Sequence, residues 1–556
     1  MMIENEPKQL IISVFDDPLT LDPHVAYDSS SRHITLNIYE SLLRYDEISK
    51  TIIPCLATQV PEPSYQGNMI EYFFPLREDV QFHNGVPMTP DDVVYSLRRV
   101  ISTTTALTAL WLEALLGERL SNPTVEQIIS ACKQVEMYDY GVKISLKHRF
   151  SPFIALVAHW SLILPRHWSI AQGDWDGTFK TLPAHISSTT KHNLATSTNG
   201  TGPFILDEWN RTSRTISFHR HKHYWGSLPD AQQVLLVSED DRVARECSLV
   251  EGKVDFAVCQ PESMKRLQLT HSLVLEESPN EWLVNPLGFM AHKLDPSCEA
   301  VGSGCFDGQG LLPEALSDRD LRLALAFSFD YQTFIEEALY GHYLNHYGAF
   351  PRVSLPEGPH PVFTYDLAQA RSHLEKAWNG EAVQAGFRLI AYTHRDNFAR
   401  VRAAHLHAQR FNQLHSRCSM EVRELPLTDL FPMLFSSQCP IVWLGWDADY
   451  NHPYTFAAQL LAEDALLPQT LGIKLPRVPE LLQKALDAQT YEEEISIYQD
   501  IAREAIQDQT YLFVPGKVSY LSYSSQWRGV KLKDGVSNVL DFSSFHWNMV
   551  KRPFGE

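Results

Sequence analysis

The segment from Ile441 to Phe456 constrains the fold more than any other part of the chain. Its first four residues, Ile441 to Leu444, are apolar and predict a buried strand. The strand stops at Gly445, and Pro453 then suits the first turn of a helix. In open α/β sheets, ligands bind at the carboxyl ends of such strands. We therefore expect the rest of the chain to be built around the loop that follows this strand, which contains Trp446, Asp447, Asp449 and Tyr450.

The rest of the chain predicts a multidomain α/β protein. Its 556 residues are too many for one hydrophobic core and predict two or three domains. Apolar strands alternate with amphipathic helices, as in α/β folds. The best-marked helix follows Met88, with Thr89 as its cap, Pro90 as its first residue and two aspartates complementing its dipole. An earlier helix is expected to take its N-cap from Ser29–Ser31 and to carry Ile34, Ile38 and Leu42 on one face.

The charge of the chain excludes some classes of partner. Lys plus Arg is 47 and Asp plus Glu is 67, so the net charge is −20. This acidic balance argues against nucleic acid and against anionic membrane surfaces, and it suits a protein that captures cationic or zwitterionic ligands. No apolar run reaches the ~18–20 residues of a membrane helix. The run from Pro152 to Pro165 comes nearest and is interrupted by His159 and Ser161, so we interpret it as core.

The N-terminus and the cysteines leave the compartment open. The polar start of the chain lacks the apolar stretch of a secretion signal, so either the protein is cytoplasmic or the signal has been removed from this numbering. Eight cysteines are few for this length. Cys298 and Cys305 lie in a Gly-rich loop, where they either close a small disulfide loop or remain two free thiols.

Two groups of polar residues could indicate catalysis or metal binding. Asp447 and Asp449 resemble the acid pair of a hydrolase, but any acidic loop supplies two carboxylates. His219, His221 and His223 alternate along a predicted strand, and side chains that share a strand face suit zinc or nickel. No Ser-His-Asp or Cys-His nucleophile context accompanies either group. We expect no enzyme activity, no cofactor and no metal site.

A series of motifs resembles the family-5 extracellular solute-binding proteins, which bind oligopeptides and dipeptides for ABC importers. The resemblance covers nearly the whole chain and keeps the order and spacing of the family. Its pieces are Leu21-Asp-Pro-His24, Ile38-Tyr-Glu-Ser-Leu-Leu43, Pro54-Cys-Leu-Ala57, Tyr72 to Arg77, Phe82 to Val93, Gly200-Thr-Gly-Pro-Phe204, Tyr224-Trp-Gly226, Glu251 to Asp255, Ser317 to Leu325 and Gly445-Trp-Asp-Ala-Asp-Tyr450.

The resemblance implies a two-lobed α/β periplasmic-binding-protein clamp, of type II and of the large peptide-binding subclass. An extra α/β domain is expected within lobe I. The implied boundaries are 1–45 for the first segment of lobe I, 46–198 for the inserted domain, 199–286 for the second segment of lobe I, 287–516 for lobe II and 517–556 for the return to lobe I. The two chain crossings of the hinge would fall near Pro286–His292 and Gln509–Lys517.

The resemblance also implies the site. Asp449 takes the position that pairs with the ligand's α-amino group, Trp446 forms a wall beside it, and Tyr450, the last residue of the loop motif, is a further expected ligand-binding residue. Arg395 is the implied anchor for the ligand's carboxylate. Some relatives carry a disulfide-bonded cysteine at the position of Asp447, so that disulfide is absent here. We expect the Asp447 side chain to make a structural hydrogen bond.

The function implied is capture of oligopeptides or dipeptides between two lobes and their delivery to a membrane-bound ABC permease for import. A periplasmic or extracellular monomer is expected, with membrane tethering compatible with it. The alternatives are a cytoplasmic ligand-sensing relative of the same fold and a member of the family that binds nickel or haem. The sequence leaves open the length and side-chain preference of the peptide.

Overall fold

The chain folds into two compact units. The structure is a computed structural model, and it describes residues 8–67, 69–120, 122–187, 193–259, 261–278, 282–344, 346–356, 364–509, 511–533 and 539–547. The first unit comprises residues 1–278, 449–451 and 519–556, and the second comprises residues 279–448 and 452–518. The chain therefore passes from one unit to the other after Ser278 and after Val518. The sequence predicted these crossings near Pro286–His292 and Gln509–Lys517. The three residues Asp449–Asn451 belong by their contacts to the first unit.

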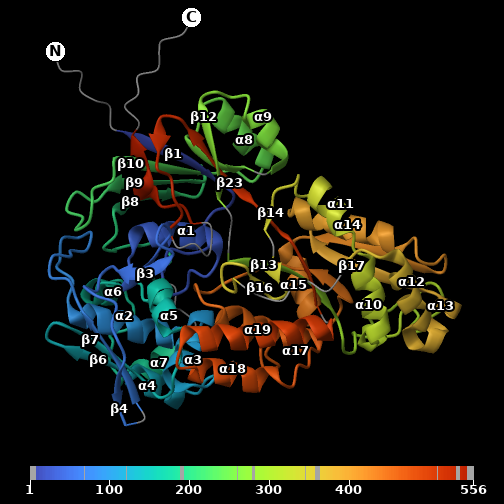
Figure 1. The fold of residues 1–556 in the computed structure, drawn as a ribbon. Helices are drawn as coiled ribbons and strands as arrows, with labels where there is room; N and C mark the ends of the chain where they lie inside the picture. Colours follow the sequence, from blue (N-terminus) through green and yellow to red (C-terminus); the bar gives the residue numbers. More distant parts are fainter. Residues whose placement is uncertain are drawn as a thin grey trace, which may run out of the picture. The chain divides into compact units, whose positions relative to one another are not determined.

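A seven-stranded mixed sheet forms the centre of the first unit (Figure 1). β1 lies between β10 and β11 and is parallel to both, whereas β23 is antiparallel to β11 and β12. The strands, in sheet order, are β12 (Leu273–Ser278), β23 (Ser519–Ser524), β11 (Phe256–Cys259), β1 (Gln9–Val14), β10 (Gln233–Ser238), β9 (Thr215–Arg220) and β8 (Phe204–Asn210).

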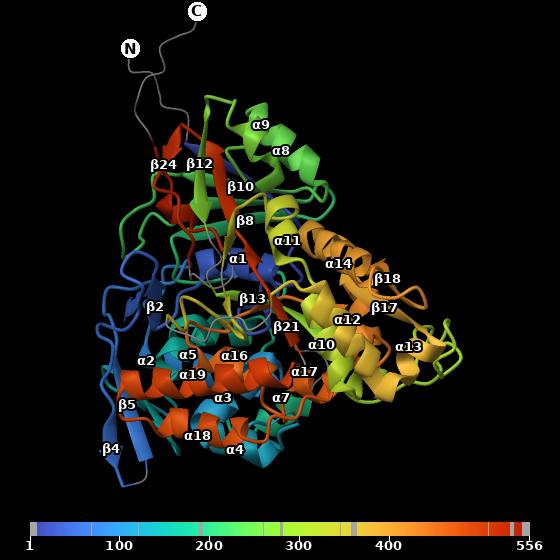
Figure 2. The same cartoon turned by 45° about the vertical axis from the view of Figure 1, so that its right-hand side comes forward.

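Helices cover both faces of this sheet because successive side chains of each strand point to opposite faces. Leu10 and Ile12 of β1 join a core that includes Ile34 and Ile38 of α1 (Ser29–Ile38). Ile11 packs on the opposite face, in the core formed with α8 (Arg242–Val250) and α9 (Met264–Leu267). Figure 2 shows α8 and α9 beside β12.

Residues within the predicted inserted domain form a second, four-stranded sheet in the first unit. Its order is β4 (Ser64–Gln66), β5 (Met69–Pro75), β7 (Gly141–Leu146) and β6 (Val135–Tyr138). The short hairpin of β2 (Leu43–Asp46) and β3 (Thr51–Pro54) precedes it. The helices of this region are α2 (Pro90–Ser102), α3 (Ala106–Leu116), α4 (Val125–Cys132), α5 (Phe153–Trp160), α6 (Arg166–Ala171) and α7 (Leu182–Ser187). A separate sheet supports an inserted domain, whose boundaries at 46–198 stay a prediction.

The second unit is built on a six-stranded sheet. β17 (Phe387–His394) is parallel to β18 (Cys418–Leu425) and to β19 (Ile441–Trp443). β13 (Leu283–Phe289) is antiparallel to β19, β20 (Trp446–Asp447) and β21 (Tyr511–Val514). Its larger helices are α10 (Arg319–Ser328), α11 (Tyr331–Glu337), α12 (Leu367–Lys376), α14 (Phe398–Phe411), α15 (Leu427–Phe435), α16 (Tyr454–Leu460), α17 (Leu466–Leu471), α18 (Val478–Asp487) and α19 (Tyr491–Asp508).

The helix starts show which local predictions succeed. The cap of α2 is confirmed: Thr89 accepts a hydrogen bond from the Asp92 amide, and the Asp92 carboxylate accepts one from the Thr89 amide. The cap predicted for α1 is wrong. Asp28 caps this helix, whereas the Ser31 hydroxyl accepts hydrogen bonds from the amides of Leu19 and Thr20. Leu42 lies beyond the end of α1 because the helix stops at Ile38.

Candidate functional site

The candidate site begins where β19 ends. The predicted strand is present over Ile441–Trp443, and the chain then forms the short strand β20 opposite β13, where the sequence predicted only a loop. The Ala448 amide continues this pairing by donating to the Trp282 carbonyl at 3.0 Å. The next three residues, Asp449–Asn451, pack in the first unit.

Two aromatic side chains of the first unit hold Asp449. The Tyr27 hydroxyl donates a hydrogen bond to the Oδ1 atom of Asp449. The Trp160 indole Nε1 donates to the backbone carbonyl of Asp449 at 2.8 Å. Asp449 is only 7% exposed, so its carboxylate has a fixed, largely desolvated position. The sequence singled out Asp449 but missed Tyr27 and Trp160, which lie 422 and 289 residues away along the chain.

These two aromatic residues belong to a stacked group. The Tyr27 and Trp160 rings lie 5.7 Å apart at an interplanar angle of 25°. The guanidinium of Arg32, on α1, lies 3.9 Å from the centre of a Trp160 ring, which is a close cation–π contact. The neighbouring His159 ring contacts Asn451 through Nε2 and the side-chain oxygen. The end of α5 therefore fixes Asp449 and Asn451 together.

A buried ion cluster holds the loop that carries Tyr27. Arg99, on α2, donates to both carboxylate oxygens of Asp22, at 2.8 and 2.6 Å, and to Asp174 at 2.5 Å. Its guanidinium also lies 3.0 Å from Nδ1 of His24, whose Nε2 is 2.8 Å from the Leu162 carbonyl. Burial and the Arg99 charge lower the pKa of His24 to about 4, so this ring is neutral at pH 7. The Leu21-Asp-Pro-His24 motif thus anchors the loop by long-range contacts.

The other predicted residues of the loop have different environments. Trp446 is half-buried, and its Nε1 is buried without a hydrogen-bond partner in the described residues. Tyr450, the other expected ligand-binding residue of the loop, is only 1% exposed. Asp447 is exposed and lies opposite Leu283 in the β13–β20 pair.

Two arginines lie near the carboxyl end of β17. Arg395, the predicted carboxylate anchor, is 58% exposed and lies 3.8 Å from Asp396. Arg400, which the sequence did not single out, is in the first turn of α14 and donates to the Asn285 side-chain oxygen at 3.4 and 3.2 Å. Burial lowers the pKa of Arg400 to about 10, against the opposing effect of the Asp447 charge. A Cβ atom at Gly445 would lie 1.6 Å from the Arg400 guanidinium, so a larger residue there would force this guanidinium to move.

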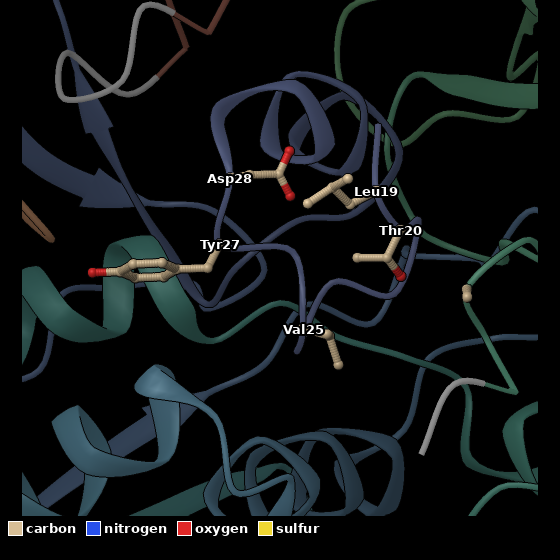
Figure 3. Close-up of a pocket in the computed structure, with 6 residues that line it drawn as sticks. Leu19, Thr20, Val25, Tyr27 and Asp28 are labelled. Atoms are coloured by element: carbon tan, nitrogen blue, oxygen red, sulfur yellow. The ribbon is translucent and has the colours of Figure 1, made fainter. Parts of the chain in front are cut away.

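A pocket of about 390 Å³ lies beside Tyr27 (Figure 3). Its lining combines apolar side chains with two polar ones, and it consists of Leu19, Thr20, Val25, Tyr27, Asp28 and Ala195. In Figure 3 the Tyr27 ring reaches away from the other labelled side chains. The same tyrosine therefore both lines the pocket and contacts Asp449 through its hydroxyl.

Three of the family motifs meet at a buried carboxylate instead of at the site. Glu40 accepts hydrogen bonds from the Tyr224 hydroxyl at 2.7 Å, the Trp225 indole at 2.9 Å and the Thr201 hydroxyl at 2.8 Å. Its burial raises the pKa of Glu40, although the three donors oppose this effect. This Glu40 cluster joins the end of α1 to the two turns that flank β8 and β9.

The predicted histidine group does not converge. β9 ends at Arg220, so only His219 lies on the strand, where its Nδ1 is 2.5 Å from Asp207. His221 is buried at 5.1 Å from the His83 ring, and His223 is exposed. Among the residues that the structure describes, no group of three or more His, Cys, Asp or Glu could hold a metal ion.

Two further features are the state of the cysteines and the length of the apolar helices. All eight cysteines are free thiols, including the exposed Cys305 and the half-buried Cys298, so the possible disulfide between these two is not formed. No helix in the described ranges is both long and apolar enough to cross a membrane.

The comparisons with known proteins agree with this architecture. Residues 51–465 match the sequence model of the bacterial extracellular solute-binding proteins, family 5 Middle. Protein XP55 of Streptomyces lividans is 26% identical over 347 residues, which cover 62% of this chain and 52% of XP55, so the chain matches about half the length of that relative. The probable D,D-dipeptide-binding periplasmic protein DdpA of Escherichia coli strain K12 is 22% identical over 548 residues, 96% of this chain and 93% of DdpA.

The fold also matches solved structures. The periplasmic binding protein DppA of Helicobacter pylori, in complex with the peptide STSA, has a TM-score of 0.74 at 19% identity, over 97% of this chain and 98% of that chain. Because the family match spans most of the chain, this protein belongs to the family-5 bacterial extracellular solute-binding proteins. The predicted family and the two-lobed α/β fold are confirmed.

Proposed function

We propose that this chain is the substrate-binding protein of an ABC importer and that its ligand is an oligopeptide or a dipeptide. The observation that carries the proposal is the buried carboxylate of Asp449, fixed by Tyr27 and Trp160. A carboxylate at a fixed, desolvated position binds an ammonium group by a strong, charge-assisted hydrogen bond. Peptide-binding relatives such as DdpA, and the DppA structure with its bound peptide, support the ligand class.

The other contacts of the peptide follow from its chemistry. Trp446 is half-buried, and we propose that its indole ring forms a wall beside the ligand. For the ligand's carboxylate we propose Arg400, because its guanidinium is already positioned by its hydrogen bonds to Asn285. Arg395 stays a predicted alternative, and Tyr450 is proposed to support the loop from within the core.

The partner proposed for the loaded protein is a membrane-bound ABC permease. The protein would act outside the cytoplasmic membrane as a monomer, and delivery of a ligand requires no chemical change in it. We therefore propose a binding function without catalysis. A sedimentation coefficient that corresponds to more than one copy of the 63.4 kDa chain would contradict the monomer.

Mass spectrometry of ligands that co-purify with the protein tests this function. The protein should be purified without refolding, examined in its native state and then denatured to release what it carries. We expect peptides with free amino termini. A nickel complex or a haem as the bound species would overturn the proposal and favour another branch of the family.

A further inference from the structure

The pocket beside Tyr27 combines exposed apolar side chains with one carboxylate, that of Asp28. Leu19 and Tyr27 are both exposed large apolar residues, 77% and 46% exposed, and Val25 and Ala195 add further apolar surface. Exposed apolar side chains around a hollow are typical of a surface that a ligand covers. The stems of lysine and arginine pack along such surfaces while their charged ends reach a polar group.

Asp28 supplies the polar group in this pocket. Its Oδ1 accepts a hydrogen bond from the Ser31 amide at 2.8 Å and thereby caps α1. Its Oδ2 takes part in no hydrogen bond or ion pair with the described residues, so it remains open to a donor from the ligand. Figure 3 shows the Asp28 carboxylate next to Leu19, on the pocket side of the Tyr27 backbone.

The pocket is coupled to the proposed amine anchor through one side chain. The Tyr27 ring points away from the other labelled residues of the pocket (Figure 3), and its hydroxyl donates to Oδ1 of Asp449. The loop that leads to Tyr27 and Asp28 is fixed at its start. The Ser31 hydroxyl accepts hydrogen bonds from the Leu19 and Thr20 amides, and the Leu21 amide donates to the Ala195 carbonyl at 2.9 Å. Because Tyr27 takes part in both the pocket and the contact with Asp449, we infer that the pocket receives one of the first side chains of a peptide held by its amino group.

We propose that this pocket binds a lysine-type or arginine-type side chain in the amino-terminal part of the peptide, and that Asp28 selects its positive charge. The inference rests on the proposed peptide-binding function and adds a ligand class to it. It also agrees with the net charge of −20, which favours positively charged ligands. Arginine and lysine suit this pocket equally in charge, and its volume of about 390 Å³ admits either stem.

Calorimetric titration with matched tripeptides tests the assignment. The probes are Lys-Ala-Ala and Ala-Lys-Ala, each paired with a peptide that has norleucine in place of lysine and so keeps the apolar stem without the charge. We expect wild type to bind at least one lysine peptide about tenfold more tightly than its norleucine partner. Asp28→Asn should bring that ratio close to one and leave the affinity for the norleucine peptide unchanged.

Both variants are expected to fold as wild type does, so that a change in affinity reports the loss of the charge. Asparagine is as good an N-cap as aspartate, so Asp28→Asn keeps the start of α1. Asp139→Asn removes the same charge from an exposed turn of the first unit and should keep the wild-type ratio. Equal affinities within both peptide pairs, or a lysine preference that survives in Asp28→Asn, would overturn the pocket assignment alone.

A further result separates this inference from the function on which it rests. If wild type binds none of the four tripeptides, the pocket assignment fails. Peptides that co-purify with the protein would then still uphold the peptide-binding function, whereas their absence would remove both.

Discussion

At the residue scale, the binding chemistry depends on how Asp449 is presented. Tyr27 donates to its carboxylate, and Trp160 holds its backbone, so the side chain cannot rotate freely. A hydrogen bond to the charged form favours ionisation of a carboxyl group, whereas burial opposes it. Tyr27 is therefore a positioning residue for the buried carboxylate of Asp449.

Tyr27→Phe should weaken peptide binding while keeping the ring. Loss of one hydrogen bond to a carboxylate predicts a loss of about 1.5 kcal/mol, or roughly tenfold in Kd, by calorimetry. An affinity equal to that of wild type would assign Tyr27 a packing role alone.

Substitutions of Arg400 and Arg395 are expected to have different effects on peptide affinity. Arg400→Gln keeps a donor for Asn285 but removes the charge, so it should weaken a peptide with a free carboxyl terminus and leave the amidated peptide unaffected. The matched change Arg395→Gln, at an exposed position, should alter neither affinity. The reverse pattern in the same calorimetric titrations would restore Arg395 as the anchor.

At the scale of elements, contacts between distant segments position the site. The Glu40 cluster joins α1 to the turns around β8 and β9, and the Arg99 cluster joins α2 to the loop of Tyr27. Removing Arg99 would leave two buried aspartates without their cation, which typically costs 3–5 kcal/mol of stability. These clusters explain why the same chain carries several motifs that lie far apart in its sequence: their side chains contact one another in the fold.

Glu40→Gln should show a pH-dependent effect on stability. Because burial raises the folded-state pKa of Glu40 above its unfolded value, its contribution is greatest at low pH and falls as pH rises through the folded-state pKa. Glutamine has the same shape and does not ionise. The wild type should therefore lose stability relative to Glu40→Gln as pH rises, in parallel urea titrations of both proteins. A constant difference at every pH would show that Glu40 titrates normally.

The local signals in the sequence were sufficient for many elements but not for the assembly of the site. The cap of α2 could be predicted because all of its partners lie within four residues, and the apolar run before Gly445 predicted β19. The contact of Tyr27 with Asp449 has no local signal at a separation of 422 residues. Arg400 was overlooked for the same reason, since Asn285 and Gly445 lie far from it in the sequence.

At the scale of the whole molecule, buried neutral histidines should make the protein sensitive to acid. Burial lowers the pKa of His24 and His407 to about 4 and that of His83 to about 3, and Arg99 adds to the shift of His24. The unfolded chain binds these protons near pH 6.5, so below that pH it holds more protons than the folded state. Stability should therefore fall with decreasing pH, until pH passes the folded-state values.

The size of this effect is about 1.4 kcal/mol per pH unit for each histidine. His407, whose Nε2 lies 2.9 Å from the Leu325 carbonyl, offers the test in the second unit. In denaturant titrations between pH 6 and 4, His407→Gln should reduce the slope of unfolding free energy against pH by that amount. A variant with the wild-type slope would exclude His407 as a source of the acid sensitivity.

The central claim is that Asp449 binds the amino group of a peptide, and one calorimetric comparison tests it most directly. Wild type and Asp449→Asn are titrated with a peptide that co-purifies with the protein, in its free form and with an acetylated amino group. We predict that acetylation or the substitution each costs about 3–5 kcal/mol, and that acetylation costs little more in the variant, since both changes remove the same charge pair. An acetylated peptide that binds wild type as tightly as the free one would contradict the claim.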